Sequence, residues 1–195
     1  MPNKDSNFKT VLAHELKRAN DAFNAFTLVA SYRLLINDNK EMAIKSYEHY
    51  SDFVAHLYEF YVGCIYLDDR FPQKTTHKEL DKILTDQAEN YLQIRRQRID
   101  KGFAPSWENA RSHYEVNVPE SFGKHWRFIR NRRNHASERR FTGEDITLSD
   151  FYEKYHQFIF LFYEEPQWLW VIKDVESYDW GDIDNFNSII RRTKS

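Results

Sequence analysis

Residues 40–67 read KEMAIKSYEHYSDFVAHLYEFYVGCIYL, without a proline. Apolar and aromatic residues recur there every three or four positions, namely Ile44, Tyr47, Tyr50, Val54, Leu57, Tyr58, Tyr61 and Ile65. That spacing places them on one face of a helix with about 3.6 residues per turn, whereas a half-buried strand would alternate. The stretch therefore predicts one long helix with a ring-rich inner face.

The same spacing continues on both sides of this stretch. An earlier helix is expected from about Asn7 to Ile36, with Leu28 and Leu35 among its apolar positions, before Asn37-Asp38-Asn39 breaks the pattern. A third helix is expected after Thr76, because Thr76 and Glu79 have the spacing of a capping box. It should end near Gly102. These three helices would form the first half of the chain.

The second half alternates between a loop and shorter helices. Residues 103–118 are predicted to form a loop with one short turn near Trp107, and a fourth helix should begin near Pro119. A fifth, ring-rich helix should be capped by Ser149-Asp150 and ended by Pro166. The stretch beyond it, with Trp168, Trp170 and Trp180, forms either one more helix or an extended arm.

Only five Gly and five Pro occur in 195 residues, which favours long helices over many short strands. We therefore predict an all-α, antiparallel bundle of about five to six helices. It is expected to be a single domain over residues 1–195, with its core at about 7–165 and a C-terminal aromatic extension at 166–195.

Composition also restricts the class of protein. A single cysteine, Cys64, cannot form an intramolecular disulfide or a multi-thiolate metal site, which fits a reducing compartment. The first residues lack the apolar stretch of a secretory signal, and no apolar run approaches the roughly 20 residues that span a bilayer. A cytoplasmic protein without a membrane partner is expected. No cofactor is predicted.

Positive charge is concentrated between residues 124 and 140, although the net charge of the whole chain is −2. Arginine matches phosphate oxygens with two parallel donors, so this segment suits a phosphate-rich partner. A solvated helix face whose arginines pair with acidic neighbours is an equal alternative on charge alone. This segment contains one acidic residue, Glu138, and the basic residues Lys124, Arg127, Arg130, Arg132, Arg133, Arg139 and Arg140.

Arg130 and His135 supply the side chains that RNA cleavage needs. The 2′-hydroxyl of RNA is a built-in nucleophile, a histidine can move its proton or donate one to the leaving 5′-oxygen, and an arginine can stabilise the charged transition state. No metal is required for this reaction. The two residues are five apart, about 140° on an ideal helix, so one site needs a helix end between them or a second copy of the chain.

The run Arg130-Asn131-Arg132-Arg133-Asn134-His135, late in a helical chain, resembles the signature of the HEPN superfamily of small all-α domains. The resemblance implies a metal-independent endoribonuclease that leaves 2′,3′-cyclic phosphate and 5′-hydroxyl ends. It also implies a homodimer whose two copies of the motif face one another across a composite active site. Many members are toxins or phage-defence effectors, so an antitoxin or another defence partner is expected.

Carried over residue by residue, the resemblance makes Arg130 the group that holds the scissile phosphate, His135 the acid–base group and Asn131 a group that orients the histidine or the phosphate. Further RNA contacts are expected from Lys124, Arg127, Arg132, Arg133, Asn134, Arg139 and Arg140. One toxin subgroup carries a modified tyrosine two places after the histidine. Ser137 stands there in this chain, which argues against silencing by that route.

Other candidates have simpler interpretations. His49 and His56 lie seven apart on the predicted second helix, but without a Glu-x-x-His pair they are expected to pack rather than to bind metal. Glu59 is expected either to be solvated or to contact the motif's arginines. The cluster Arg95-Arg96-Gln97-Arg98 either extends an RNA groove or favours the negative end of its own helix. A non-catalytic binding module and a purely structural helical protein remain the alternatives to a nuclease.

Overall fold

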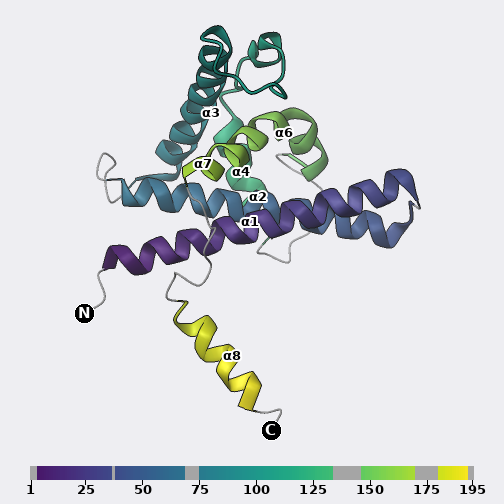
Figure 1. Ribbon diagram of the computed structural model, residues 1–195, viewed down its shortest axis with the longest axis vertical. Coiled ribbons are helices and arrows are strands. Elements are labelled where there is room, and N and C mark those ends of the chain that lie inside the picture. Colours follow the sequence, from purple (N-terminus) through teal and green to yellow (C-terminus); the bar gives the residue numbers. More distant parts are fainter. Residues whose placement is uncertain (1–3, 37, 69–74, 134–145, 170–179, 193–195) are drawn as a thin grey trace.

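The structure is a computed structural model that describes residues 4–36, 38–68, 75–133, 146–169 and 180–192. Within these ranges the chain is helical and contains no strand, so the predicted all-α class is confirmed. Figure 1 shows a long α1–α2 hairpin that supports the shorter helices. In order, the elements are α1 (Lys4–Leu35), α2 (Lys40–Leu67), α3 (His77–Asp100), a 3₁₀ turn η1 (Arg111–Tyr114), α4 (Phe122–Arg133), α6 (Leu148–Glu164), α7 (Pro166–Leu169) and α8 (Asp182–Arg192).

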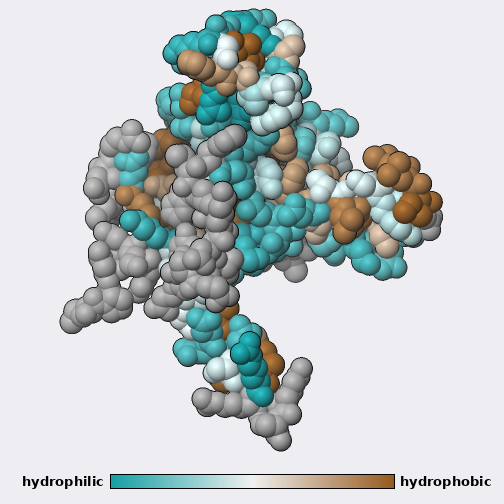
Figure 2. Space-filling model, in the orientation of Figure 1, coloured by the Kyte–Doolittle hydropathy of each residue, from teal (hydrophilic) through white to brown (hydrophobic). Residues whose placement is uncertain are grey.

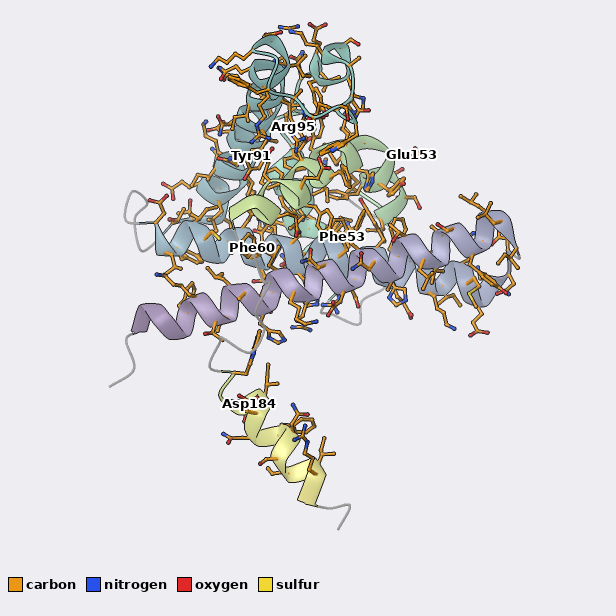
Figure 3. All side chains as sticks on the ribbon, viewed as in Figure 1. Phe53, Phe60, Tyr91, Arg95, Glu153 and Asp184 are labelled. Atoms are coloured by element: carbon orange, nitrogen blue, oxygen red, sulfur yellow. The ribbon has the colours of Figure 1, made fainter. Side chains whose placement is uncertain are left out.

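Helix α2 has the predicted bounds, Lys40–Leu67. It begins at Asn39, whose side chain accepts a hydrogen bond from the backbone N–H of Met42 at 3.0 Å, as expected of an N-cap. Phe53 and Phe60 on this helix are fully buried, and Figure 3 shows them along the part of α2 that the shorter helices cover. The ring-rich face of α2 is therefore the floor of the core.

The far end of the hairpin is less covered than the spacing predicted. Ile44 is 49% exposed, so its expected place on the inner face is wrong, and Leu28 and Leu35, which continue the apolar spacing of α1, are 73% and 82% exposed. The hairpin projects beyond α4 and α6 at this end (Figure 1), and Figure 2 shows a hydrophobic patch there. The helical period places these residues on one face, but no described element reaches far enough to cover it.

Helix α3 begins as predicted. The Thr76 hydroxyl accepts from the backbone N–H of Glu79, and the Glu79 carboxylate accepts from the backbone N–H of Thr76 at 2.7 Å. This is the reciprocal capping box. The helix ends just before Gly102, whose φ of 71° suits a residue without a Cβ. The loop that follows contains the turn near Trp107 and also η1, which was not predicted.

Helix α4 is fixed against α2 and α3 by its buried face. Trp126 is fully buried, and its indole N–H donates to the carbonyl of Val54 on α2 at 2.9 Å. On the α3 side, a Cβ at Gly123 would overlap the backbone of Asp81, so only glycine permits this close approach. The hydroxyl of Thr85 accepts from the Gly123 N–H at 3.1 Å. These contacts set the height and rotation of the helix that carries Arg130.

Helix α6 begins two residues earlier than predicted. Thr147, rather than Ser149-Asp150, is the N-cap, and Asp150 completes a second capping box as its third helical residue. The Asp150 carboxylate accepts from the Thr147 N–H at 3.1 Å. Thr147 and Asp150 both belong to the capping box, so the sequence signal was present but the cap was placed two residues too late. The helix ends before Pro166 as predicted.

The C-terminal stretch contains α8, which resolves the choice between a helix and an arm for residues 182–192. Figure 1 shows α8 separated from the bundle, and Figure 3 places Asp184 on its first turn. The Trp180 ring meets His14 of α1 edge-on, with ring centroids 5.8 Å apart. No described helix is long and apolar enough to cross a bilayer.

Candidate active site

Arg130 lies on α4 and faces α2. Its Nε and Nη2 atoms contact the carboxylate of Glu59, and its Nη1 donates to Oδ1 of Asn131 at 2.9 Å. The guanidinium lies 6.0 Å from the centre of the Tyr58 ring. Arg130 and Glu59 are each about one-third exposed, so the pair is accessible from solvent. Of the two expectations for Glu59, contact with the motif is the one that the structure confirms.

The contact with Asn131 gives this residue a position next to the arginine. An asparagine oxygen can accept from a guanidinium while the amide nitrogen keeps its two donors. Three of the five N–H groups of Arg130 are thereby directed at Glu59 and Asn131. The other two N–H groups of Arg130 can donate to an anion. The arrangement fixes the guanidinium plane before any ligand arrives.

Arg133, one turn further along α4, contacts the carboxylate of Asp52 on α2. Three helices meet around the two arginines and form a pocket of about 200 Å³. Its lining residues are Glu15, Arg18, Ala55, His56, Glu59, Arg130 and Arg133. This pocket, called here the Arg130 pocket, is the candidate active site.

A second pocket of about 340 Å³ also has Arg133 in its wall. Arg132 lines it too, and donates to the backbone carbonyl of Ile146 just before α6. His49 and Asp52 come from α2 on the opposite side. The second pocket therefore extends the polar surface from the Arg130 pocket towards the start of α6.

Two of the expected RNA-binding residues lie apart from these pockets. Arg127 faces α3, where Nε and Nη2 form two parallel bonds of 2.9 and 2.8 Å to the carboxylate of Asp81. The hydrogen bond to Asp81 raises the pKa of Arg127. Lys124 is exposed, with its ammonium 5.3 Å from the centre of the Phe128 ring. Arg127 thus contributes to the α3–α4 contact instead of facing the Arg130 pocket.

Four of the predicted site residues lie outside the described part of the chain. They are Asn134, His135, Arg139 and Arg140. How His135, the expected partner of Arg130, lies relative to it is therefore outside the described part of the chain. Ser137 belongs to the same segment.

A buried histidine of the pocket was not identified from the sequence as a site residue. His56 is 6% exposed, and its Nδ1 lies 2.8 Å from the carboxylate of Glu15 on α1. Burial opposes ionisation of Glu15, but the hydrogen bond with His56 and the nearby charges of His56, Arg18 and His14 together outweigh it, so the pKa of Glu15 is lowered. His56 is buried, as its expected packing role requires. Its contact with Glu15 could not be predicted from the spacing, because the two residues are 41 positions apart.

The second basic cluster has a structural role that neither expectation anticipated. Arg95 is 1% exposed and reaches three carboxylates, those of Glu108, Glu164 and Glu165, at 2.8–3.0 Å. Figure 3 shows Arg95 on the part of α3 that lies away from the hairpin. Burial and the neighbouring Glu108 raise the pKa of Glu164, against the opposing effect of Arg95. Arg95 thus joins α3, the following loop and the end of α6.

Within the described ranges, no three His, Cys, Asp or Glu side chains are grouped so that they could hold a metal ion. Cys64 lies partly buried, and burial raises the pKa of its thiol to about 12. Comparison of the chain with family models, with characterised proteins and with solved structures finds no match. The site must therefore be interpreted from its own chemistry.

Proposed function

We propose that this protein is an endoribonuclease that cuts RNA without a metal ion. The 2′-hydroxyl attacks the adjacent phosphate, giving a 2′,3′-cyclic phosphate and a 5′-hydroxyl end. Arg130 holds the scissile phosphate, Asn131 orients Arg130, and His135 serves as the acid–base group. The observation that carries the proposal is that Arg130, hydrogen-bonded to Asn131, lines a pocket with two further arginines.

The arginine chemistry supports phosphate binding at this place. Arg18, Arg130 and Arg133 line one pocket of about 200 Å³, and Arg132 lines the adjoining one. A guanidinium binds phosphate oxygens by paired donors and stabilises charge that builds on phosphorus. In this proposal the phosphate binds the two N–H groups of Arg130 that Glu59 and Asn131 leave available, and it displaces the partly exposed carboxylate of Asp52 from Arg133.

The biological setting that we propose follows from the HEPN resemblance of the motif. The protein acts as a homodimer in the cytoplasm, where Arg130 and His135 of both copies form a composite active site. An RNA-cutting toxin or phage-defence effector, controlled by an antitoxin or another defence partner, fits such a chain.

The direct test is cleavage of total RNA by purified protein in EDTA, followed by mapping of the new ends. The wild-type protein should produce cyclic phosphates, and Arg130→Ala and His135→Ala should each reduce the rate by at least about 100-fold. Arg111→Ala is the matched control, because Arg111 is an exposed arginine on η1. An inactive wild-type protein, or full activity in both site variants, would exclude the proposal.

A purely structural helical protein is the second candidate, and one observation favours it. Arg127, Arg130 and Arg133 each have a carboxylate partner, as expected of arginines that hold helices together. Such a protein would show neither RNA binding that weakens steeply with salt nor new cyclic-phosphate ends. A non-catalytic binding module would show the salt-dependent binding without the new ends, so a binding titration and the end-mapping experiment together separate these candidates from the nuclease.

A further inference from the structure

Three helices each present two polar side chains, three positions apart, to the Arg130 pocket. Residues at this spacing share a helix face, so both members of each pair can line one cavity. The only described histidine in the lining is His56. The pairs are Glu15 and Arg18 on α1, His56 and Glu59 on α2, and Arg130 and Arg133 on α4.

The contact with Glu15 fixes which nitrogen of His56 carries a proton. A carboxylate whose pKa is lowered is ionised and can only accept, so the Nδ1 atom of His56 must donate. In the neutral ring the Nε2 atom is then an acceptor. His56 therefore carries a proton-accepting nitrogen in a wall of the pocket that also contains Arg130.

This geometry supplies a group that the proposed reaction can use. Cleavage requires a base for the 2′-hydroxyl and an acid for the leaving 5′-oxygen. Each copy of the motif contributes one histidine, and His56 adds a further proton-accepting nitrogen to the pocket that Arg130 lines. The charged groups around His56 are Glu15 and Arg18 from α1, Glu59 from α2, and Arg130 and Arg133 from α4; His14 on α1 is also close enough to interact with it.

We propose that His56 is the general base of the reaction and that Glu15 is its positioning residue. The inference rests on the proposed nuclease function. Nε2 of His56 takes the proton of the 2′-hydroxyl while the 2′-oxygen forms a bond to phosphorus. The bond from phosphorus to the 5′-oxygen breaks, and His135 donates a proton to that oxygen. Arg130 stabilises the charge on the phosphate oxygens, and Glu15 stabilises the imidazolium that forms.

The decisive variant is His56→Asn. The side-chain amide of Asn places a donor near the position of Nδ1, so the contact with Glu15 is kept while the proton-accepting nitrogen is removed. Cleavage should fall by at least about 100-fold, the usual contribution of a general base. His77→Asn is the matched control, because His77 is an exposed histidine at the start of α3. Its rate should equal that of the wild type.

A substrate with a better leaving group separates base from acid. In a short RNA with sulfur in place of the bridging 5′-oxygen, the leaving group no longer needs a proton. The loss in His135→Ala should therefore be largely rescued, whereas the loss in His56→Asn should persist. Equal rescue of both variants, or cleavage by His56→Asn within about threefold of the wild-type rate, would overturn the role of His56.

The wild-type protein offers a second measurement that does not depend on a variant folding. Nitrogen-15 NMR of the histidine rings should find the proton of neutral His56 on Nδ1, and Glu15→Ala should abolish this preference. A proton on Nε2 in the wild type would overturn the proposal. If the wild type cuts no RNA, the nuclease function fails together with this inference; an active wild type with an active His56→Asn removes only the inference.

Discussion

The Glu59 carboxylate on α2 contacts the Arg130 guanidinium on α4, 71 positions away in the chain. This contact takes up part of the guanidinium that the proposed reaction needs for phosphate. It also holds the guanidinium in place next to Asn131. In the proposed reaction Glu59 would therefore oppose RNA binding at Arg130 by its charge while it orients the guanidinium.

Glu59→Gln should consequently change RNA affinity and cleavage rate in opposite directions. The amide still accepts from Arg130 but no longer competes as an anion, so RNA should bind about 3- to 10-fold more tightly at low salt, a gain of roughly 1 kcal/mol typical of exposed charges. The rate at saturating RNA should fall, because the guanidinium is held less firmly. Fluorescence anisotropy and single-turnover cleavage measure the two effects. Weaker binding by this variant would show that Glu59 is purely structural.

Mixing two inactive variants tests the composite site. If Arg130 of one copy acts with His135 of the other, heterodimers of Arg130→Ala and His135→Ala contain one complete pair. Activity should reappear when the two proteins are mixed after brief unfolding and refolding together. Each variant refolded alone is the control, and light scattering gives the oligomeric state. A monomer at working concentration, or no recovery in a mixture shown to exchange subunits, would contradict the shared site.

Gly123→Ala should destabilise the protein through the α3–α4 contact. The added methyl group would overlap the backbone of Asp81, which cannot move away as a side-chain end can. We expect a loss of at least about 1–3 kcal/mol, the usual cost of overpacking. Gly63→Ala is the matched control, because its methyl group would overlap the end of the Leu12 side chain and touch the Phe8 ring, with no backbone atom among these neighbours. Urea unfolding should give a clearly smaller loss for Gly63→Ala; equal losses would contradict this view of the contact.

Arg95→Met should be more damaging than its place outside the site suggests. It leaves the carboxylates of Glu108, Glu164 and Glu165 without the cation that joins them. Breaking a buried ion pair by removing one partner costs about 3–5 kcal/mol. Arg98→Met, which removes a more exposed partner of Glu165, is the control and should cost much less. A similar small loss in both variants would indicate that the carboxylates remain well solvated.

Glu15 should contribute to the acid sensitivity of the fold. The pKa of Glu15 is lowered in the folded state. The stability that it provides is therefore fully present above its unfolded pKa of about 4.5 and is lost as the pH falls through the lower folded value. Glu15→Gln should be less stable than the wild type at neutral pH and lose less further stability on acidification. Urea midpoints from neutral to acidic pH give the comparison, and identical curves would refute the assignment.

Helix bounds and caps could be predicted because they depend on neighbouring residues. The period of residues 40–67 gave α2 its bounds, and Thr76 with Glu79 gave α3 its first turn. Exposure of Leu35 and Ile44 could not be predicted this way, because a period identifies a face but not whether another helix covers it.

For the site, the sequence by itself determined that Arg130 and Asn131 are neighbours within a basic segment, whereas the hydrogen bond between them is a finding of the structure. The partners of the arginines were decided by tertiary structure alone. Glu59, Asp52, Asp81 and the His56–Glu15 pair come from helices distant in sequence. Close packing at Gly123 and Trp126 sets how α4 lies on α2 and α3, and that packing decides which carboxylate each arginine meets.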